Sequence, residues 1–325
     1  MVRAAAFRRD PFPASAEQGP GAKTGRRAPP RHNENCCCRC GLLGTGDGDA
    51  VQWAPASKRR PTVAMKIVVC IKQVPDSANI RINPETRTLM REGAAAIVNP
   101  FDMYAIEAAL QIRDKLGGTV TALSMGPKQA ESALREALER GVNDAVLLCD
   151  RAFAGSDTYA TSYVLAQAIR KIGGVDVVVF GRQASDGDTA QVGPGVATHL
   201  DLPQITYAGR LVEVTPESIT AERLLEDGRE TLRASVPCVL TVVREIGEPR
   251  LPSLRGKMAA KRAEIPVWTA ADIGAEPERC GLKGSPTKVV KAFTPEPRAG
   301  GEIFDGDPET AVAALVDRLR PIVIG

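Results

Sequence analysis

Short apolar runs alternate with amphipathic stretches along most of the chain. Compact runs rich in β-branched residues occupy positions 66–71, 119–125, 145–149 and 177–180, and apolar residues recur at helical spacing between them. Strands separated by helices are typical of a parallel sheet that is covered by helices on both faces. The sequence therefore predicts an α/β fold with a doubly wound, mostly parallel sheet.

Several of the expected helices carry start signals. Asn99 can cap a helix whose first residue is Pro100, and Asp102 lies three residues after that cap. Further helices are expected after Gly126-Pro127 and after Ser156-Asp157. The polar stretch 80–89 predicts a hairpin or an arm.

Beyond Leu200 the pattern changes to alternation. Residues 211–214, 218–224 and 236–243 are expected to be antiparallel strands at an added edge of the same sheet, with a charged turn at 226–229. Beyond Ile265 the chain is rich in Pro and Gly, which predicts an extended C-terminal arm, followed by a helix that starts at Asp307-Pro308.

Residues 1–64 differ from the rest of the chain. They are rich in Arg, Pro, Gly and Ala without periodicity, so we expect this segment to be disordered. An alternative is that translation starts at Met65 and that residues 1–64 come from an incorrectly assigned upstream start codon. We expect a nucleotide-binding α/β domain over 65–250, and a recognition loop followed by a C-terminal arm over 251–325. The balance of 42 basic against 39 acidic residues favours neither nucleic acid nor an anionic membrane, and we expect a cytoplasmic protein without membrane insertion.

The cysteines and histidines make a metal site improbable. Cys36, Cys37, Cys38 and Cys40 crowd together without the paired spacing that wraps a tetrahedral ion, and the chain has only two histidines. The other four cysteines are scattered and are interpreted as reduced core residues. We expect no metal and no catalytic acid or base.

The most informative stretch is a glycine-bearing loop that follows the apolar run ending at Phe180. Gly181 and Gly187 allow tight turns, and Asp188 or Thr189 can cap the next helix, whose free N–H groups suit an anion. Pro194 implies either an irregular first turn or a helix that starts there. Asp186 and Asp188 would repel a diphosphate, so they are expected either to accept hydrogen bonds from ligand hydroxyls or only to cap a turn.

Ligands of doubly wound sheets bind at the carboxyl ends of the strands. Cys70, Asn99, Met125, Gly126 and the Gly181 loop are all expected at that edge. Arg182 is expected either to offset diphosphate charge or to form a surface ion pair.

The loop also carries a family resemblance. Gly181-Arg182-Gln183-Ala184, followed by 186–194 (DGDTAQVGP), resembles the nucleotide-binding segment of the electron transfer flavoprotein beta subunit, in its electron-bifurcating and nitrogen-fixation-associated form. The resemblance runs from Met65 to about Gly325, and stretch 226–241 resembles the second signature of the family. It implies cofactor binding by Cys70, Asn99, Phe101, Asp102, Met125, Gly126, Gly181, Arg182, Gln183, Asp186, Gly187, Asp188, Thr189, Ala190, Gln191 and Val192.

The resemblance implies a cofactor and partners. Members hold either AMP as a structural cofactor or FAD in the same groove, and Gly187 in place of a bulkier acid favours FAD here. The implied partners are an alpha subunit, which has its own FAD and against which the C-terminal arm packs, and an acyl-CoA dehydrogenase anchored through Leu254 or a quinone oxidoreductase. Ferredoxin or flavodoxin is implied as a further partner, with NADH as a donor. The alternatives are a single-flavin beta subunit that holds AMP and, more distantly, a stand-alone adenine-nucleotide-binding regulator of the universal-stress type.

Overall fold

The computed structural model describes residues 41–42, 64–76, 81–82, 89–90, 96–288, 290 and 300–323. It divides into a large unit (1–81 and 90–288) and a small one (82–89 and 289–325). The strands are β1 (Gly41–Leu42), β2 (Met65–Cys70), β3 (Gln73–Pro75), β4 (Arg81–Ile82), β5 (Leu89–Met90), β6 (Ala96–Val98), β7 (Gly118–Met125), β8 (Asp144–Leu148), β9 (Val177–Gly181), β10 (Gln204–Val214), β11 (Ser218–Leu224), β12 (Arg229–Ser235), β13 (Cys238–Val242) and β14 (Val267–Trp268). The helices are α1 (Pro100–Leu116), α2 (Glu131–Glu139), α3 (Thr158–Ile172), α4 (Val192–Leu200), α5 (Leu254–Arg262), α6 (Gly281–Gly284) and α7 (Pro308–Val323).

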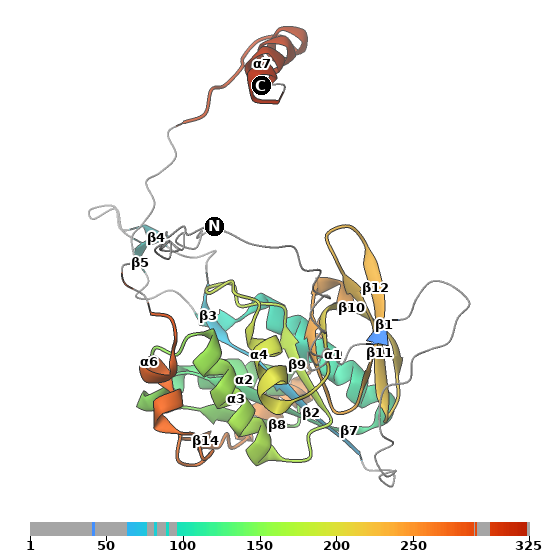
Figure 1. The fold of residues 1–325 in the computed structure, drawn as a ribbon, viewed down its shortest axis with the longest axis vertical. Helices are drawn as coiled ribbons and strands as arrows, with labels where there is room; N and C mark the ends of the chain where they lie inside the picture. Colours follow the sequence, from blue (N-terminus) through green and yellow to red (C-terminus); the bar gives the residue numbers. More distant parts are fainter. Residues whose placement is uncertain are drawn as a thin grey trace, which may run out of the picture. The chain divides into compact units, whose positions relative to one another are not determined.

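The large unit is built on a ten-stranded sheet in the order β1-β12-β11-β10-β13-β9-β2-β7-β8-β14. The strands from β10 to β14 in this order are parallel to their neighbours, and β11, β12 and β1 extend the edge in antiparallel fashion. Buried residues of α1 and α2 pack on one face of the sheet and those of α3 and α4 on the other (Figure 1). The predicted doubly wound, mostly parallel α/β fold is confirmed.

Two expectations about the strands beyond Leu200 were wrong in part. Stretch 236–243 was expected to be antiparallel, but β13 runs parallel to both β9 and β10 in the middle of the sheet. Its residues are all buried, and burial on both faces is characteristic of central parallel strands. β12 was not predicted at all, because three of its seven residues are charged.

The predicted helix signals mostly hold. Asp157 caps α3 by accepting hydrogen bonds from the Tyr159 and Ala160 amides, and Gly117 ends α1 with a φ of 77°. The expected hairpin is present as the β4-β5 pair, and its turn lies outside the described residues. Apart from β1 and Ala64, the expectations for residues 1–64 also lie outside the described part of the chain.

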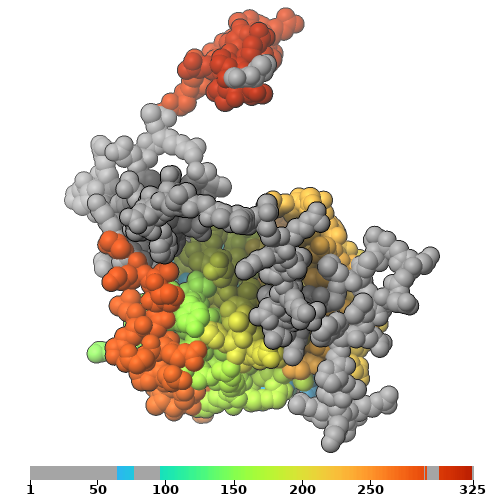
Figure 2. Space-filling model, in the orientation of Figure 1, coloured from blue at the N-terminus to red at the C-terminus, as the bar shows by residue number. Residues whose placement is uncertain are grey.

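Residues 276–287, within the stretch where the arm was expected, belong to the large unit and bond to its helix α3 and to the cap of that helix. The Asp157 carboxylate, besides capping α3, accepts hydrogen bonds from the amide and hydroxyl of Thr287 at 3.0 and 2.8 Å. The Glu276 amide donates to the Tyr163 hydroxyl at 3.0 Å. Figure 2 shows this segment in orange, lying against the green residues of α3.

The last helix of the chain, α7, begins where the sequence predicts. The Asp307 carboxylate accepts hydrogen bonds from the Glu309 and Thr310 amides, as an N-cap does. Within the small unit the apolar side chains of α7 are exposed, among them Val312, Leu315, Val316 and Leu319.

Candidate functional site

The Gly181 loop (residues 181–191) lies at the switch point of the sheet. From β2 the chain proceeds through β7 to β8 on one side, and β9 then lies on the other side of β2. β2 and β9 are parallel, with Cys70 opposite Phe180, so both strands end at the same edge. A crevice outside the carboxyl ends at such a point is where doubly wound sheets bind ligands.

Asn99 attaches the loop to helix α1. It occupies the predicted N-cap position but makes no side-chain cap. Instead its amide nitrogen donates to the Gln183 carbonyl oxygen at 2.8 Å, and its amide oxygen accepts from the Ser185 amide at 3.1 Å. Because Asn99 is 1% exposed, this is a buried anchor that fixes the position of the loop.

Asp102 joins three elements at the bottom of the site. Its carboxylate accepts a hydrogen bond from the Lys72 amide, just beyond β2, at 2.7 Å, and another from the Gly181 amide at the end of β9. Burial raises the pKa of Asp102 to about 7, against the opposing effect of these bonds, of the Asn99 side chain and of the Lys72 charge. Its oxygens therefore bond to the protein, and contact with a ligand stays a prediction.

Gly181 is required by the closeness of α1. A Cβ atom at this position would lie 2.3 Å from Asp102 Oδ1 and 2.6 Å from the backbone carbon of Phe101. The glycine was predicted to permit a tight turn, but its φ is not positive. Its role is to let β9 and the start of α1 come into contact.

The left-handed turns of the loop occur at other residues. Asp188 and Ala190 have φ of 54° and 56°, whereas Gly187 does not have a positive φ. A Cβ at Gly187 would meet nothing within 4 Å. The backbone conformation of Gly187 therefore does not require glycine. The consequence of this residue is that the space beside the loop, where a side chain would lie, is left open.

Helix α4 begins later than either predicted cap. Its N-cap is Gln191, without a side-chain bond, so neither Asp188 nor Thr189 caps it. Pro194 is the third residue of the helix, within the first turn, where a missing N–H costs no hydrogen bond. The helix thus begins at Val192, two residues before Pro194.

Lys72 is a site residue that the sequence analysis missed. Its ammonium nitrogen lies 2.7 Å from Asp186 Oδ1 and 2.8 Å from Oδ2, which links the end of β2 to the loop. The second acid of the loop, Asp188, accepts a short hydrogen bond from the Gln183 side chain. Position 72, directly after a buried strand that ends at the binding edge, was the signal that could have identified Lys72.

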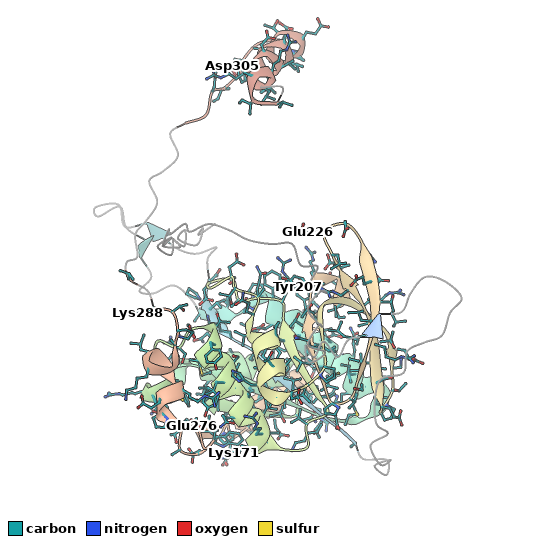
Figure 3. All side chains as sticks on the ribbon, viewed as in Figure 1. Lys171, Tyr207, Glu226, Glu276, Lys288 and Asp305 are labelled. Carbon is teal, nitrogen blue, oxygen red and sulfur yellow. The ribbon has the colours of Figure 1, made fainter. Side chains whose placement is uncertain are left out.

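Arg182 begins the loop beside two aromatic rings. Its guanidinium carbon lies 5.3 Å from the centre of the Tyr207 ring and 5.8 Å from that of Phe101. Tyr207, labelled in Figure 3, has a φ of 58°, which is unusual for an aromatic residue. The adjoining pocket has a volume of about 390 Å³ and is lined by Arg182, Tyr207, Arg223, Leu224, Leu225, Glu226, Val243 and Glu245.

The remaining predicted residues lie at the same edge. Cys70 ends β2, where burial, followed by the charge of Asp102, raises its pKa well above the ordinary value for a thiol. Met125 ends β7, and the Gly126 amide donates to the Leu148 carbonyl oxygen at 3.0 Å. Thr189 is exposed, and its hydroxyl lies 3.4 Å from that of Thr158 at the start of α3. Because the Cys70 thiol is buried and its pKa is raised, it is unsuited to act as a nucleophile.

The electron transfer flavoprotein domain matches residues 86–273, more than half of the chain. The chain belongs to the electron transfer flavoprotein family. It is 52% identical over 257 residues to the electron transfer flavoprotein subunit beta of Thermoanaerobacterium thermosaccharolyticum, covering 79% of this chain and 98% of that one.

Two further relatives of this electron transfer flavoprotein match a similar share of the chain. Protein FixA of Azorhizobium caulinodans is 50% identical over 256 residues, covering 77% of this chain and 91% of that one. The caffeyl-CoA reductase-Etf complex subunit CarD of Acetobacterium woodii is 46% identical over 258 residues, covering 79% and 98%. The predicted relationship to beta subunits of the bifurcating and nitrogen-fixation-associated group is confirmed.

Leu254, the predicted partner-binding residue of this electron transfer flavoprotein, is the first residue of α5. Ser253 caps the helix through the Gly256 amide, and the Leu254 side chain is 78% exposed. The structure thus leaves it accessible on the surface.

None of the helices in the described part of the chain has the length and apolar character to cross a membrane.

Proposed function

We propose that this chain is the beta subunit of a heterodimeric electron transfer flavoprotein that binds FAD at the Gly181 loop. Support comes from the loop itself, which Asn99 and Asp102 fix at the switch point of the sheet while residues 185–189 stay exposed. The alpha subunit is proposed to supply a second FAD. NADH, ferredoxin or flavodoxin, and an acyl-CoA dehydrogenase or quinone oxidoreductase are the proposed electron donor and acceptors.

The residues present suit an anionic dinucleotide. The bare carboxylate of Asp186 would repel a diphosphate, but the ammonium group of Lys72 at 2.7 Å offsets that charge. Thr189 and the loop amides are proposed to meet the phosphates, and Asp186 and Asp188 to accept hydrogen bonds from hydroxyls. Arg182 is proposed to supply a further positive charge beside the diphosphate.

When bound, a flavin supplies the hydride and electron chemistry. The chain's own residues then bind and orient it, and no side chain of the site needs to act as an acid or base. The open space above Gly187 is the observation that carries the choice of FAD, because it leaves room for a group larger than AMP to follow the loop.

The test of cofactor identity is the flavin and AMP content of the purified heterodimer after co-expression with the alpha subunit. The expected result is two FAD and no AMP per heterodimer. One FAD with one AMP would contradict the proposal and would make this chain the structural and docking subunit of a single-flavin carrier.

Replacing Gly187 with aspartate is expected to lower FAD affinity at this subunit at least about tenfold without unfolding the protein. The new carboxylate occupies the open space and adds a third acid beside Asp186 and Asp188, and like charges at a binding site cost several kcal/mol. Gly300→Asp is the matched control, since a Cβ there also meets nothing within 4 Å. Equal FAD content in both variants would place the cofactor elsewhere.

We further propose that Leu254 binds the dehydrogenase partner. Leu254→Ala is expected to raise the KM for that partner about tenfold, as loss of an interface anchor does, and to leave the unfolding free energy within about 0.5 kcal/mol because the side chain is exposed. Val212→Ala, on the exposed side of β10, is the control. An unchanged KM in the Leu254 variant would remove this residue from the docking surface.

A further inference from the structure

The docking segment (residues 250–262) combines exposed apolar side chains with a fixed backbone. Leu251 is 86% exposed, Leu254 78% and Met258 51%. In the whole of α5 only Ala260 is buried, so the segment gains little from its own packing. A stretch with so few buried side chains would be expected to move freely unless other contacts hold it.

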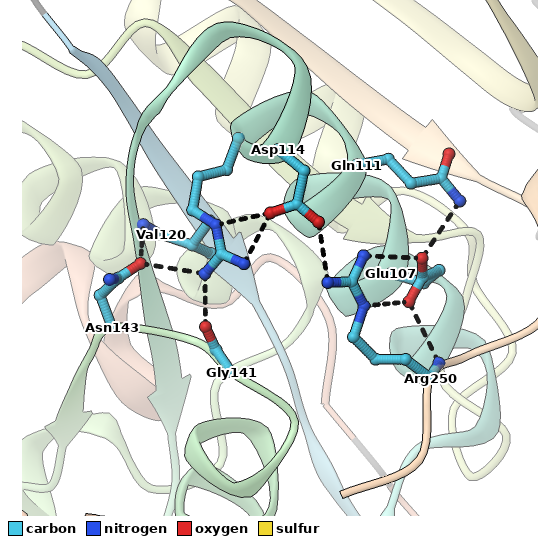
Figure 4. Close-up of polar contacts among 8 residues, drawn as sticks. Glu107, Gln111, Asp114, Val120, Gly141, Asn143 and Arg250 are labelled. Atoms are coloured by element: carbon cyan, nitrogen blue, oxygen red, sulfur yellow. Dashed lines mark hydrogen bonds and ion pairs between the residues drawn. The ribbon is translucent and has the colours of Figure 1, made fainter. Parts of the chain in front are cut away.

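The start of the segment is held by Arg250. Its guanidinium donates to Glu107 of α1 through two nitrogens, at 2.8 and 3.0 Å, and to Asp114 of the same helix at 2.9 Å (Figure 4). The Arg250 amide also donates to Glu107, at 3.1 Å. The side chain and backbone of one residue are thus both attached to α1, immediately before the first exposed leucine.

Arg135 of α2 and Arg140, the residue that follows this helix, also hold the segment. Arg140 donates to the Arg250 carbonyl oxygen at 2.6 Å, and Arg135 donates to the Ala260 carbonyl oxygen at 2.6 Å. Between them Gly256 packs against α2 so closely that a Cβ would lie 2.2 Å from the Glu139 carbonyl oxygen. Both ends and the middle of the segment are therefore attached to the helical layer, while its apolar side chains remain on the surface.

The Glu107–Arg250 pair is better explained by geometry than by stability. Glu107 is buried, and a buried ion pair often contributes no more stability than apolar side chains of similar size. What the forked, hydrogen-bonded pair does provide is a defined geometry, and an interface that is ordered before binding loses less entropy when the partner arrives.

We propose that Arg250 is a positioning residue that orders the docking segment for a partner with an apolar pocket and an acidic rim. The inference rests on the proposed docking of a dehydrogenase through Leu254. The acidic rim follows from the exposed basic side chains around the leucines, namely Arg255, Lys257, Lys261 and Arg262. Asn99 directly precedes α1 and Asp102 lies in its first turn, so the pair attaches the docking segment to the helix whose start holds the Gly181 loop.

The test uses Arg250→Lys in the heterodimer, because lysine keeps the positive charge beside Glu107 but cannot form the forked pair. We expect the amides of 251–262 to exchange with deuterium at least about tenfold faster. We also expect the KM for an acyl-CoA dehydrogenase from the same organism to rise about tenfold, with kcat and FAD content unchanged. Arg113→Lys is the matched control. Arg113 lies on α1, the helix that carries Glu107, and donates hydrogen bonds to Asp114 and Gly141, but not to the docking segment.

A second variant guards against unfolding of the first. Glu107→Gln with Arg250→Met removes both charges at once, so that neither is left buried and unpaired, and it should show the same faster exchange and raised KM. Unchanged exchange of 251–262 in both variants would overturn the inference. Faster exchange with an unchanged KM would overturn the link to docking, whereas a wild-type heterodimer that does not reduce the dehydrogenase would contradict the proposed partner.

Discussion

Replacing Gly181 with alanine is expected to destabilise the protein by about 3 kcal/mol or more and to abolish cofactor binding. The added methyl carbon would lie 2.3 Å from Asp102 Oδ1, 2.6 Å from the Phe101 backbone carbon and 2.8 Å from the Asp102 nitrogen. Two of these three atoms belong to the backbone of α1, which cannot turn away as a side chain can. Urea unfolding and the FAD content of the heterodimer measure the two effects.

Gly187→Ala is the matched control for this change. The substitution is the same and lies in the same loop, but a Cβ at Gly187 meets nothing within 4 Å and its φ is not positive. We expect its unfolding free energy to stay within about 0.5 kcal/mol of the wild type. If the two variants were equally stable, the contact between the end of β9 and the start of α1 would not be as close as described.

The fold was largely predictable because its signals are local. Each buried parallel strand is a short apolar run, and a cap such as Asp157 is recognisable from its neighbours. The position of β13 was not predictable in this way. Its place between β9 and β10 is decided by the pairing of residues far apart in sequence, which no local pattern records.

The site was predictable at the level of its loops but not of its contacts. Sequence reasoning brought Asn99, Asp102 and the Gly181 loop to one edge of the sheet. It did not anticipate that Asn99 would bond to the loop in preference to capping α1, or that Lys72 would pair with Asp186. Such partners are chosen by three-dimensional proximity, and several residue types could have satisfied the same sequence pattern.

Asp102 is expected to make stability depend on pH in the direction opposite to that of an ordinary paired carboxylate. The folded protein holds the proton of Asp102 up to a pKa of about 7, whereas the unfolded chain releases it near the ordinary value of 3.8. The folded state therefore binds more protons between these values. The stability that results is fully present below about pH 4 and is lost as the pH rises through about 7.

Asp102→Asn removes this titration while keeping the shape of the side chain. The unfolding free energy of the wild type, relative to that of the variant, is expected to fall by about 3 kcal/mol between pH 5 and pH 8. Urea unfolding of the two proteins at a series of pH values measures the difference. Asp114→Asn is the control. Burial of Asp114 is outweighed by hydrogen bonds from Arg113 and Arg250, which hold the pKa of this carboxyl below its ordinary value. The difference in unfolding free energy between the wild type and Asp114→Asn should therefore stay constant between pH 5 and pH 8.

A constant difference for Asp102→Asn would have a specific meaning. It would show that Asp102 stays ionised in the folded protein, with the hydrogen bonds from Lys72, Asn99 and Gly181 outweighing its burial. The carboxylate would then add a fixed negative charge directly beneath the proposed phosphate-binding loop. A falling difference means that Asp102 is neutral below a pH of about 7 and becomes charged above it, so FAD binding should weaken as the pH rises through this value in the wild type and not in the asparagine variant.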